Sequence, residues 1–99
     1  MEAIKAYELE MELARVRELR RAVELKMREL NYAEEVLGAG KRDRGIYRVF
    51  SDLLVEITKE EALEHIERMR RAYKRESERL KKKEREIMEE LSKLKAPRS

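Results

Sequence analysis

Apolar residues recur through residues 2–37 at alternating steps of four and three, and no Gly or Pro interrupts the stretch. This heptad spacing is typical of a helix that buries one face against another helix. The d position of the heptad is apolar throughout: Leu9, Val16, Val23, Leu30 and Leu37. The a position is mixed: Ala6, Leu13, Arg20, Met27 and Glu34. At 1.5 Å per residue, the stretch predicts a coiled-coil helix of about 54 Å.

A second helix is predicted over residues 59–95. Thr58 and Glu61 have the spacing of a capping box, which begins a helix, and Pro97 follows the last apolar residue of the pattern. The d position carries Ile66, Tyr73, Leu80, Ile87 and Leu94, and the a position carries Leu63, Arg70, Ser77, Glu84 and Leu91. Two helices of matching length joined by a short element predict an antiparallel coiled coil, in which the polar seam residues fix the register.

Between the helices, residues 46–57 are rich in β-branched and large apolar side chains and predict a hairpin with strands 46–50 and 53–57. Pairing of Phe50 with Leu53 sets the register and leaves both faces mainly apolar. A lone two-stranded ribbon is marginal in water, and its edges invite pairing with another chain. We therefore predict an oligomerisation hairpin with these contact residues: Ile46, Tyr47, Val49, Phe50, Leu53, Leu54, Val55 and Ile57.

The 99 residues are interpreted as a single domain, with a linker at 38–45 and a tail at 96–99. Gly38 follows the last periodic residue of the first helix, where glycine commonly ends a helix. The linker contains the Gly-Lys pair of a phosphate-binding loop, but Glu35 and Arg42 replace the Gly and Ser/Thr that such a loop requires. A flexible connector is therefore the interpretation of this segment.

The composition argues against an enzyme, because charged residues make up 47% of the chain and there is no Cys. The single histidine, His65, takes an outward heptad position, so metal and nucleophile constellations lack their usual members. Carboxylates recur four residues from a cation, as in Glu24 and Arg28, which supports a helix. We predict no catalytic, cofactor or metal site. The start of the chain has no signal-peptide pattern and no apolar run could span a membrane, which together predict a cytoplasmic protein.

A second apolar stripe, which we call the outer stripe, lies near the start of the first helix and points away from the seam; it consists of Ile4, Tyr7 and Met11. Glu18 and Arg21 are expected to end this stripe, and Met88 lies near it on the second helix, beside Leu91 and Leu94. A frayed terminus or a local oligomer contact would account for these residues. The functional interpretation is an exposed patch that binds other proteins, to which methionine lends adaptable contacts. The predicted tip site comprises Ile4, Tyr7, Met11, Met88, Leu91 and Leu94.

Residues 68–85 hold ten Lys or Arg and three Glu, a net charge of +7 in a chain whose overall charge is +3. Such a face could bind nucleic acid or the acidic segments of a protein client or partner. The chain has few aromatic residues that could stack on bases. A solvated face, offset by acidic residues of neighbouring subunits, is the favoured interpretation.

Residues 46–62 resemble the β class of prefoldin subunits. The resemblance covers an Ile-Tyr-Arg start, a Leu-Leu-Val second strand and a Thr-Lys-Glu-Glu-Ala entry to the second helix. The order of elements matches over nearly the whole chain, and a single hairpin suits the β class because α-class subunits carry two. The sequence departs at the turn, where Ser51 stands in place of the usual Gly. Asp52 is expected to help the turn by adopting a left-handed conformation.

The resemblance implies a mostly α fold with a small β element, in which the hairpin assembles with other subunits into an intersubunit β-barrel. It implies a subunit of an ATP-independent hexameric co-chaperone that captures unfolded proteins at its coiled-coil tips, prevents their aggregation and passes them to a group II chaperonin. The implied partners are an α-class subunit, copies of this chain, unfolded clients and the chaperonin, with no membrane and no favoured role for nucleic acid. The alternative is a nucleic-acid-binding or purely structural coiled coil that uses the basic face 68–85.

Overall fold

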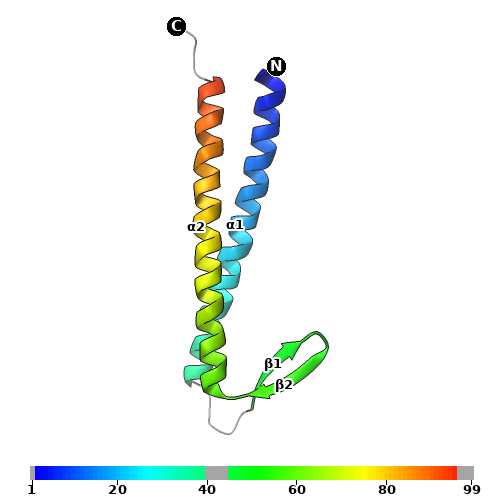
Figure 1. Cartoon of the computed structure of the whole chain (residues 1–99), viewed down its shortest axis with the longest axis vertical. Coiled ribbons are helices and arrows are strands. Elements are labelled where there is room, and N and C mark those ends of the chain that lie inside the picture. The colour runs from blue at the N-terminus through cyan, green and yellow to red at the C-terminus, as the bar shows by residue number, and fades with distance from the viewer. Residues whose placement is uncertain (1, 40–44, 96–99) are drawn as a thin grey trace.

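The computed structural model describes residues 2–39 and 45–95. In chain order its elements are α1 (Glu2–Ala39), β1 (Ile46–Phe50), β2 (Leu53–Ile57) and α2 (Lys59–Lys95). The start of α1 and the end of α2 lie at one end of a rod, and the hairpin projects from the other end (Figure 1). The molecule extends 71 × 25 × 16 Å along its principal axes. This arrangement confirms the predicted pair of long helices joined by a hairpin, while the β-barrel between subunits stays a prediction.

The helix α1 runs to Ala39 and includes Gly38, two residues beyond the expected end at residue 37. A glycine that ends a helix usually adopts a positive φ, and no glycine among the described residues does so. Gly38 also has open space around the position that a Cβ would occupy, so it is not required there by a close approach. The remainder of the predicted linker, residues 40–44 with the Gly-Lys pair, and the predicted tail 96–99 lie outside the described residues.

A reciprocal capping box begins α2, as the sequence predicts. The Glu61 amide donates a hydrogen bond to Thr58 Oγ1 at 3.1 Å, and the Thr58 amide donates to Glu61 Oε1 at 3.3 Å. The Thr58 hydroxyl also contacts Glu61 Oε1 at 3.1 Å. These bonds satisfy amide groups that have no partner within the first turn of a helix, and they join α2 directly to the end of β2.

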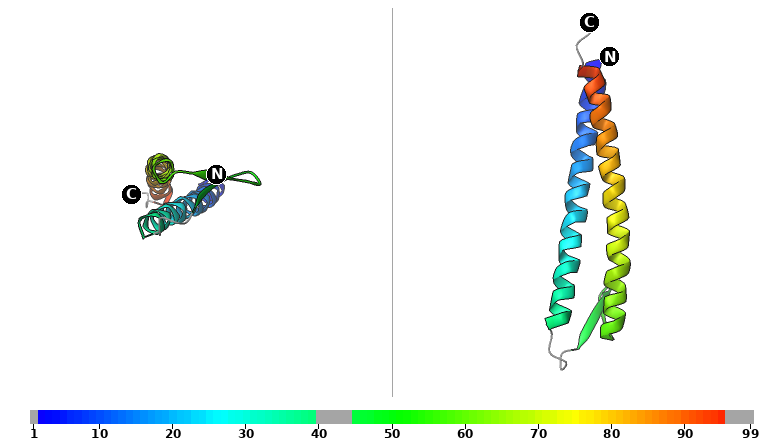
Figure 2. Two further views of the ribbon diagram at one scale, coloured as in Figure 1. Left: turned by 90° about the horizontal axis from the view of Figure 1, so that it is seen from below. Right: turned by 90° about the vertical axis from the view of Figure 1, so that its left-hand side faces the viewer.

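The apolar core of the rod is a seam between the two helices. Leu80 lies at its centre with 1% of its surface exposed, and the other buried members of the cluster are Leu9, Leu13, Val16, Ile87 and Leu91. Ala6, Val23 and Leu94 pack partly buried against them. All these residues occupy predicted a or d positions. The cluster lies in the half of the rod away from the hairpin, and the helices cross as they run along it (Figures 1 and 2).

The hairpin has the predicted register, with Phe50 paired to Leu53 and Ile46 paired to Ile57. The turn differs from the expectation, because Ser51 and not Asp52 takes the left-handed conformation, at φ 56°. Positive φ at the first turn residue alone is the pattern of a type II′ turn, which matches the twist of the flanking strands and usually has Gly at that position. A serine at this position therefore carries a local conformational cost.

Replacement of Ser51 by Gly is expected to stabilise the hairpin by about 1 kcal/mol, because Gly adopts positive φ without the Cβ clash. Hydrogen exchange of the hairpin amides measures the effect as slower exchange. The matched control is Asp52→Gly, since Asp52 has a negative φ and only gains freedom in the unfolded chain. Equal protection in the two variants would contradict the assignment of the strain to Ser51.

Candidate functional site

The hairpin presents apolar side chains to solvent on both of its faces. Tyr47, Val49 and Leu54 are exposed on one face, Leu54 at 70%. Phe50, Leu53 and Val55 are exposed on the other face, and Ile46 and Ile57 at the root are half-buried. All eight residues of the predicted oligomerisation hairpin therefore lie on one projecting ribbon (Figure 1). A two-stranded ribbon with two apolar faces is stable only when another surface covers it.

The root of the hairpin meets α2 around Arg48. The Arg48 guanidinium lies over the Phe50 ring, 4.5 Å from its centroid. His65, half-buried on α2, lines the same hollow as Arg48, Phe50 and Arg68. Burial lowers the pKa of His65 below its ordinary value of 6.5, and the charges of Arg48 and Arg68 lower it further. Acidic residues of both elements, Glu56, Glu61 and Glu64, complete this hollow.

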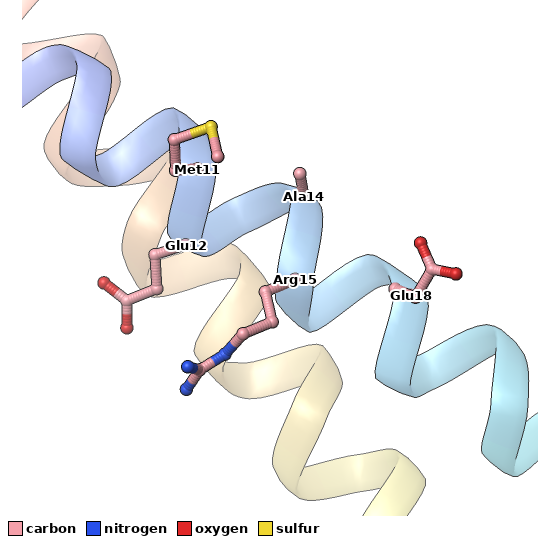
Figure 3. Close-up of a pocket in the computed structure, with 5 residues that line it drawn as sticks. All are labelled: Met11, Glu12, Ala14, Arg15 and Glu18. Carbon is pink, nitrogen blue, oxygen red and sulfur yellow. The ribbon is translucent and has the colours of Figure 1, made fainter.

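The tip of the rod combines a closed seam with an open outer surface. Ile4, Tyr7 and Met11 are exposed on the outer side of α1, Tyr7 at 64%, and Met88 is exposed on α2. Leu91 is buried in the seam at 7% exposure, and Leu94 packs against the same cluster. Of the six predicted tip residues, four therefore form the outer surface and two support it from inside. Met11 and Ala14 extend from α1 beside a hollow that Glu12, Arg15 and Glu18 also line (Figure 3).

The outer stripe of α1 does not end at Glu18 and Arg21, contrary to the expectation. Leu25 and Tyr32 are both exposed, and they continue the seven-residue step that joins Ile4, Met11 and Glu18. Leu19 and Val36, at the g and c positions of the same helix, are exposed as well. Glu18 is the one charged residue in this seven-residue series, and the apolar residues after it keep the same spacing. The sequence alone therefore indicates that the outer stripe continues beyond Glu18.

A charged group lies inside the seam next to the apolar core. Glu84 keeps 13% of its side chain exposed and pairs with two arginines of α1. Its Oε1 accepts from Arg17 Nε at 3.1 Å, and its Oε2 accepts from Arg20 Nη1 at 2.5 Å. Nearer the hairpin, Arg70 pairs with Glu34 across the seam and with Glu67 on its own helix. The pairs Glu84 with Arg20 and Arg70 with Glu34 join a positions across the seam, and they fix the axial alignment of the two helices.

Within residues 2–39 and 45–95, no group of three or more His, Cys, Asp or Glu side chains is placed to hold a metal ion. Neither helix of the described chain is long and apolar enough to cross a membrane.

Comparison with known proteins gives consistent matches. A family model described as "Prefoldin subunit" matches residues 1–97. The crystal structure of the prefoldin β2 subunit from Thermococcus strain KS-1 is similar with a TM-score of 0.86 and 66% identity, over 94% of this chain and 99% of that chain. The prefoldin β subunit of the same strain shares the fold at a TM-score of 0.58 and 22% identity, over 97% of this chain and 91% of that one. Among curated proteins, none matches this sequence.

The fold defines a class of antiparallel two-helix coiled coils whose helices are joined by one exposed β-hairpin. The family match over nearly the whole chain shows that the chain belongs to the prefoldin family, and the 66% identical structure places it among the β-class subunits. Prefoldin subunits are non-enzymatic components of a co-chaperone, so the prediction that the chain is not an enzyme is confirmed. Family membership also supports oligomerisation with other prefoldin subunits, including an α-class partner.

The charge of Glu84 is expected to stabilise the seam. Glu84→Gln should lower the free energy of unfolding by about 1–2 kcal/mol, because two arginines lose a charged acceptor in a part-buried position. Urea unfolding measures the loss. The matched control is Glu76→Gln, which removes an exposed i,i+3 pair with Arg79 and should change stability by less than about 0.5 kcal/mol. Equal losses in the two variants would show that Glu84 has no special role.

His65 is expected to make the hairpin root sensitive to acid. Its lowered pKa means that the unfolded chain binds a proton before the folded chain does, so stability falls as pH drops below about 6.5 toward the folded pKa. Unfolding free energies at pH 7.5 and pH 5.5, values on either side of that ordinary pKa, should differ less in His65→Gln than in the natural chain. The same pH dependence in both proteins would assign the acid sensitivity to other groups.

Proposed function

We propose that this chain is a subunit of an ATP-independent, hexameric, cytoplasmic co-chaperone. Its tips capture unfolded proteins and prevent their aggregation, and the complex passes them to a group II chaperonin. The hairpin joins the chain to an α-class subunit and to further copies of this chain. Membership of the prefoldin family supports the co-chaperone role, and the exposed surfaces of the chain support the division of labour between hairpin and tip.

The observation that carries the proposal is the position of the outer stripe at the tip. Ile4, Tyr7 and Met11 are exposed on α1 while the seam beneath them is already closed by Leu9, Leu13 and Leu91. These side chains therefore contribute little to the stability of the coiled coil. Large apolar side chains that remain in water without a packing role are typical of a surface that binds other proteins.

The size of the tip patch suits capture by many weak contacts. One tip offers three large apolar residues from α1 and Met88 from α2, and methionine adapts to different partners. Several arms joined at their hairpins would present several such patches to one unfolded chain. Binding at one tip then raises the effective concentration of the client at the next, so avidity accounts for retention without ATP.

The tip is tested with the triple variant Ile4→Ser, Tyr7→Ser and Met11→Ser, assembled with an α-class subunit. We expect suppression of the aggregation of a denatured model protein to fall severalfold, because the apolar contact area is lost. The matched control is Leu25→Ser with Tyr32→Ser, which removes exposed apolar side chains of the same helix away from the tip. If the triple variant suppresses aggregation as well as the natural chain, or if the control loses as much suppression, client binding does not take place at the tip.

Light scattering of the same proteins separates capture from assembly. The tip variant should retain the mass of the hexamer. Phe50→Asp with Leu54→Asp should lose the hexamer, because it places charge on both apolar faces of the hairpin. A hexamer that persists in the hairpin variant would show that assembly uses another surface.

A further inference from the structure

The structure sorts the ten cations of residues 68–85 into two groups. Arg70, Arg79 and Lys83 form ion pairs within the chain, with Glu34 and Glu67, with Glu76 and with Glu12 respectively. The other seven are exposed, and among the described residues none of them takes part in an ion pair. We call these seven residues the basic ridge: Arg68, Arg71, Lys74, Arg75, Lys81, Lys82 and Arg85.

The basic ridge occupies one continuous sector of α2. Its members take the e, b and f positions of the heptad, which adjoin one another around the helix and lie on one flank and the outer face. Within this sector, residues 68–85 contain one acid, Glu78. At 1.5 Å per residue the ridge is about 25 Å long, and its outermost cations recur every seven residues, or about 10.5 Å.

The opposite flank of α2 lacks this excess of positive charge. Its c and g positions place Arg79 and Lys83 among Glu76, Glu86 and Glu90, and both cations are ion-paired. Acidic residues also bound the ridge at both ends of the outer face, with Glu61 on the hairpin side and Glu89 on the tip side. The positive charge is therefore concentrated in one sector and does not arise merely from a uniformly charged helix.

The side chains on the basic ridge indicate which class of partner it can bind. Over the described length of α2, the exposed large apolar side chain is Met88, which lies beyond the ridge, so a peptide would find no apolar anchor on it. The nearest aromatic residue, Tyr73, is half-buried at the seam, where Lys26 Nζ lies 5.8 Å from its ring centroid. Within the described part of α2, the ridge therefore offers single-stranded nucleic acid no side chain on which bases could stack. Arg and Lys on a convex surface suit phosphate groups.

We infer that the basic ridge of α2 binds the phosphate backbone of duplex nucleic acid, without sequence preference. A duplex carries one negative charge per about 1.7 Å of its axis, so a sector of cations about 25 Å long faces many phosphates at once. The outer face of α2 is convex, and the major groove of DNA, about 12 Å wide, admits a helix. This surface is separate from both the tip and the hairpin, and the inference does not depend on the proposed capture of clients.

The test is fluorescence anisotropy of a labelled duplex of about 20 base pairs with the full chain, at about 50 and about 200 mM salt. Two double variants remove one Arg and one Lys each. Arg75→Gln with Lys82→Gln changes the ridge, and Arg79→Gln with Lys83→Gln changes the ion-paired flank, with the same change in net charge. We expect the ridge variant to bind about tenfold or more weakly, with a salt slope smaller by about 2, and the flank variant to bind like the natural chain.

Four outcomes would overturn the inference. They are no binding of the natural chain at low salt, an equal loss in the two variants, tighter binding of a single strand of the same length, and equally tight binding of polyglutamate of matching charge. The last result would identify an acidic protein segment as the partner. Circular dichroism checks that each variant is folded, and Arg68→Gln with Arg71→Gln provides a second ridge variant. Unchanged suppression of aggregation by the ridge variants would show that the two surfaces act separately.

Discussion

The packing of one apolar stripe of α1 against one apolar stripe of α2 determines where every other part of the molecule lies. Among the described residues the two helices pack only on each other, and Leu80 and the residues around it form their main buried cluster. Because each helix buries one stripe, the remaining positions of both helices face outward along the whole rod. The hairpin stays at one end and the free ends of the helices stay at the other because the seam holds the helices antiparallel (Figure 1).

Charged residues at a positions complete this arrangement by specifying alignment. A charged residue at an a position specifies the register, because at the wrong level of the seam it loses its partner. Glu84 meets Arg17 and Arg20, and Arg70 meets Glu34, only when the helices are aligned as observed. These two groups of ion pairs lie at different heights along the rod. A shift of one helix along the other by one heptad would therefore break both groups. Apolar packing thus supplies most of the stability, and these ion pairs add to it and specify the register.

The features that the sequence predicts well are those that a local pattern decides. The heptads identify nearly every buried residue of the seam, the Thr58 and Glu61 spacing identifies the cap of α2, and pairing of Phe50 with Leu53 follows from a two-residue turn. Features that depend on contacts between distant residues are harder to predict. Which cations of residues 68–85 are paired depends on partners as distant as Glu12 and Glu34.

Three differences have more local causes. Ser51 adopts the left-handed conformation because the twist of the strands demands it at the first turn position, whatever residue stands there. Leu91 belongs to the seam by its heptad position, although its closeness to the free end also suggested a surface role. The outer stripe continues beyond Glu18 with the same seven-residue spacing, but the charge of Glu18 makes the stripe look as if it ends there.

The separation between the inner seam and the outer stripe has an evolutionary consequence. Residues such as Ile4, Tyr7 and Met11 share a helix with the core but are exposed on its outer face, so substitutions there leave the pairing of the helices intact. Selection can therefore change the outer face of an arm without first having to compensate for lost stability. Duplicated copies of such an arm could diversify in what they recognise while their length, alignment and point of attachment stay constant.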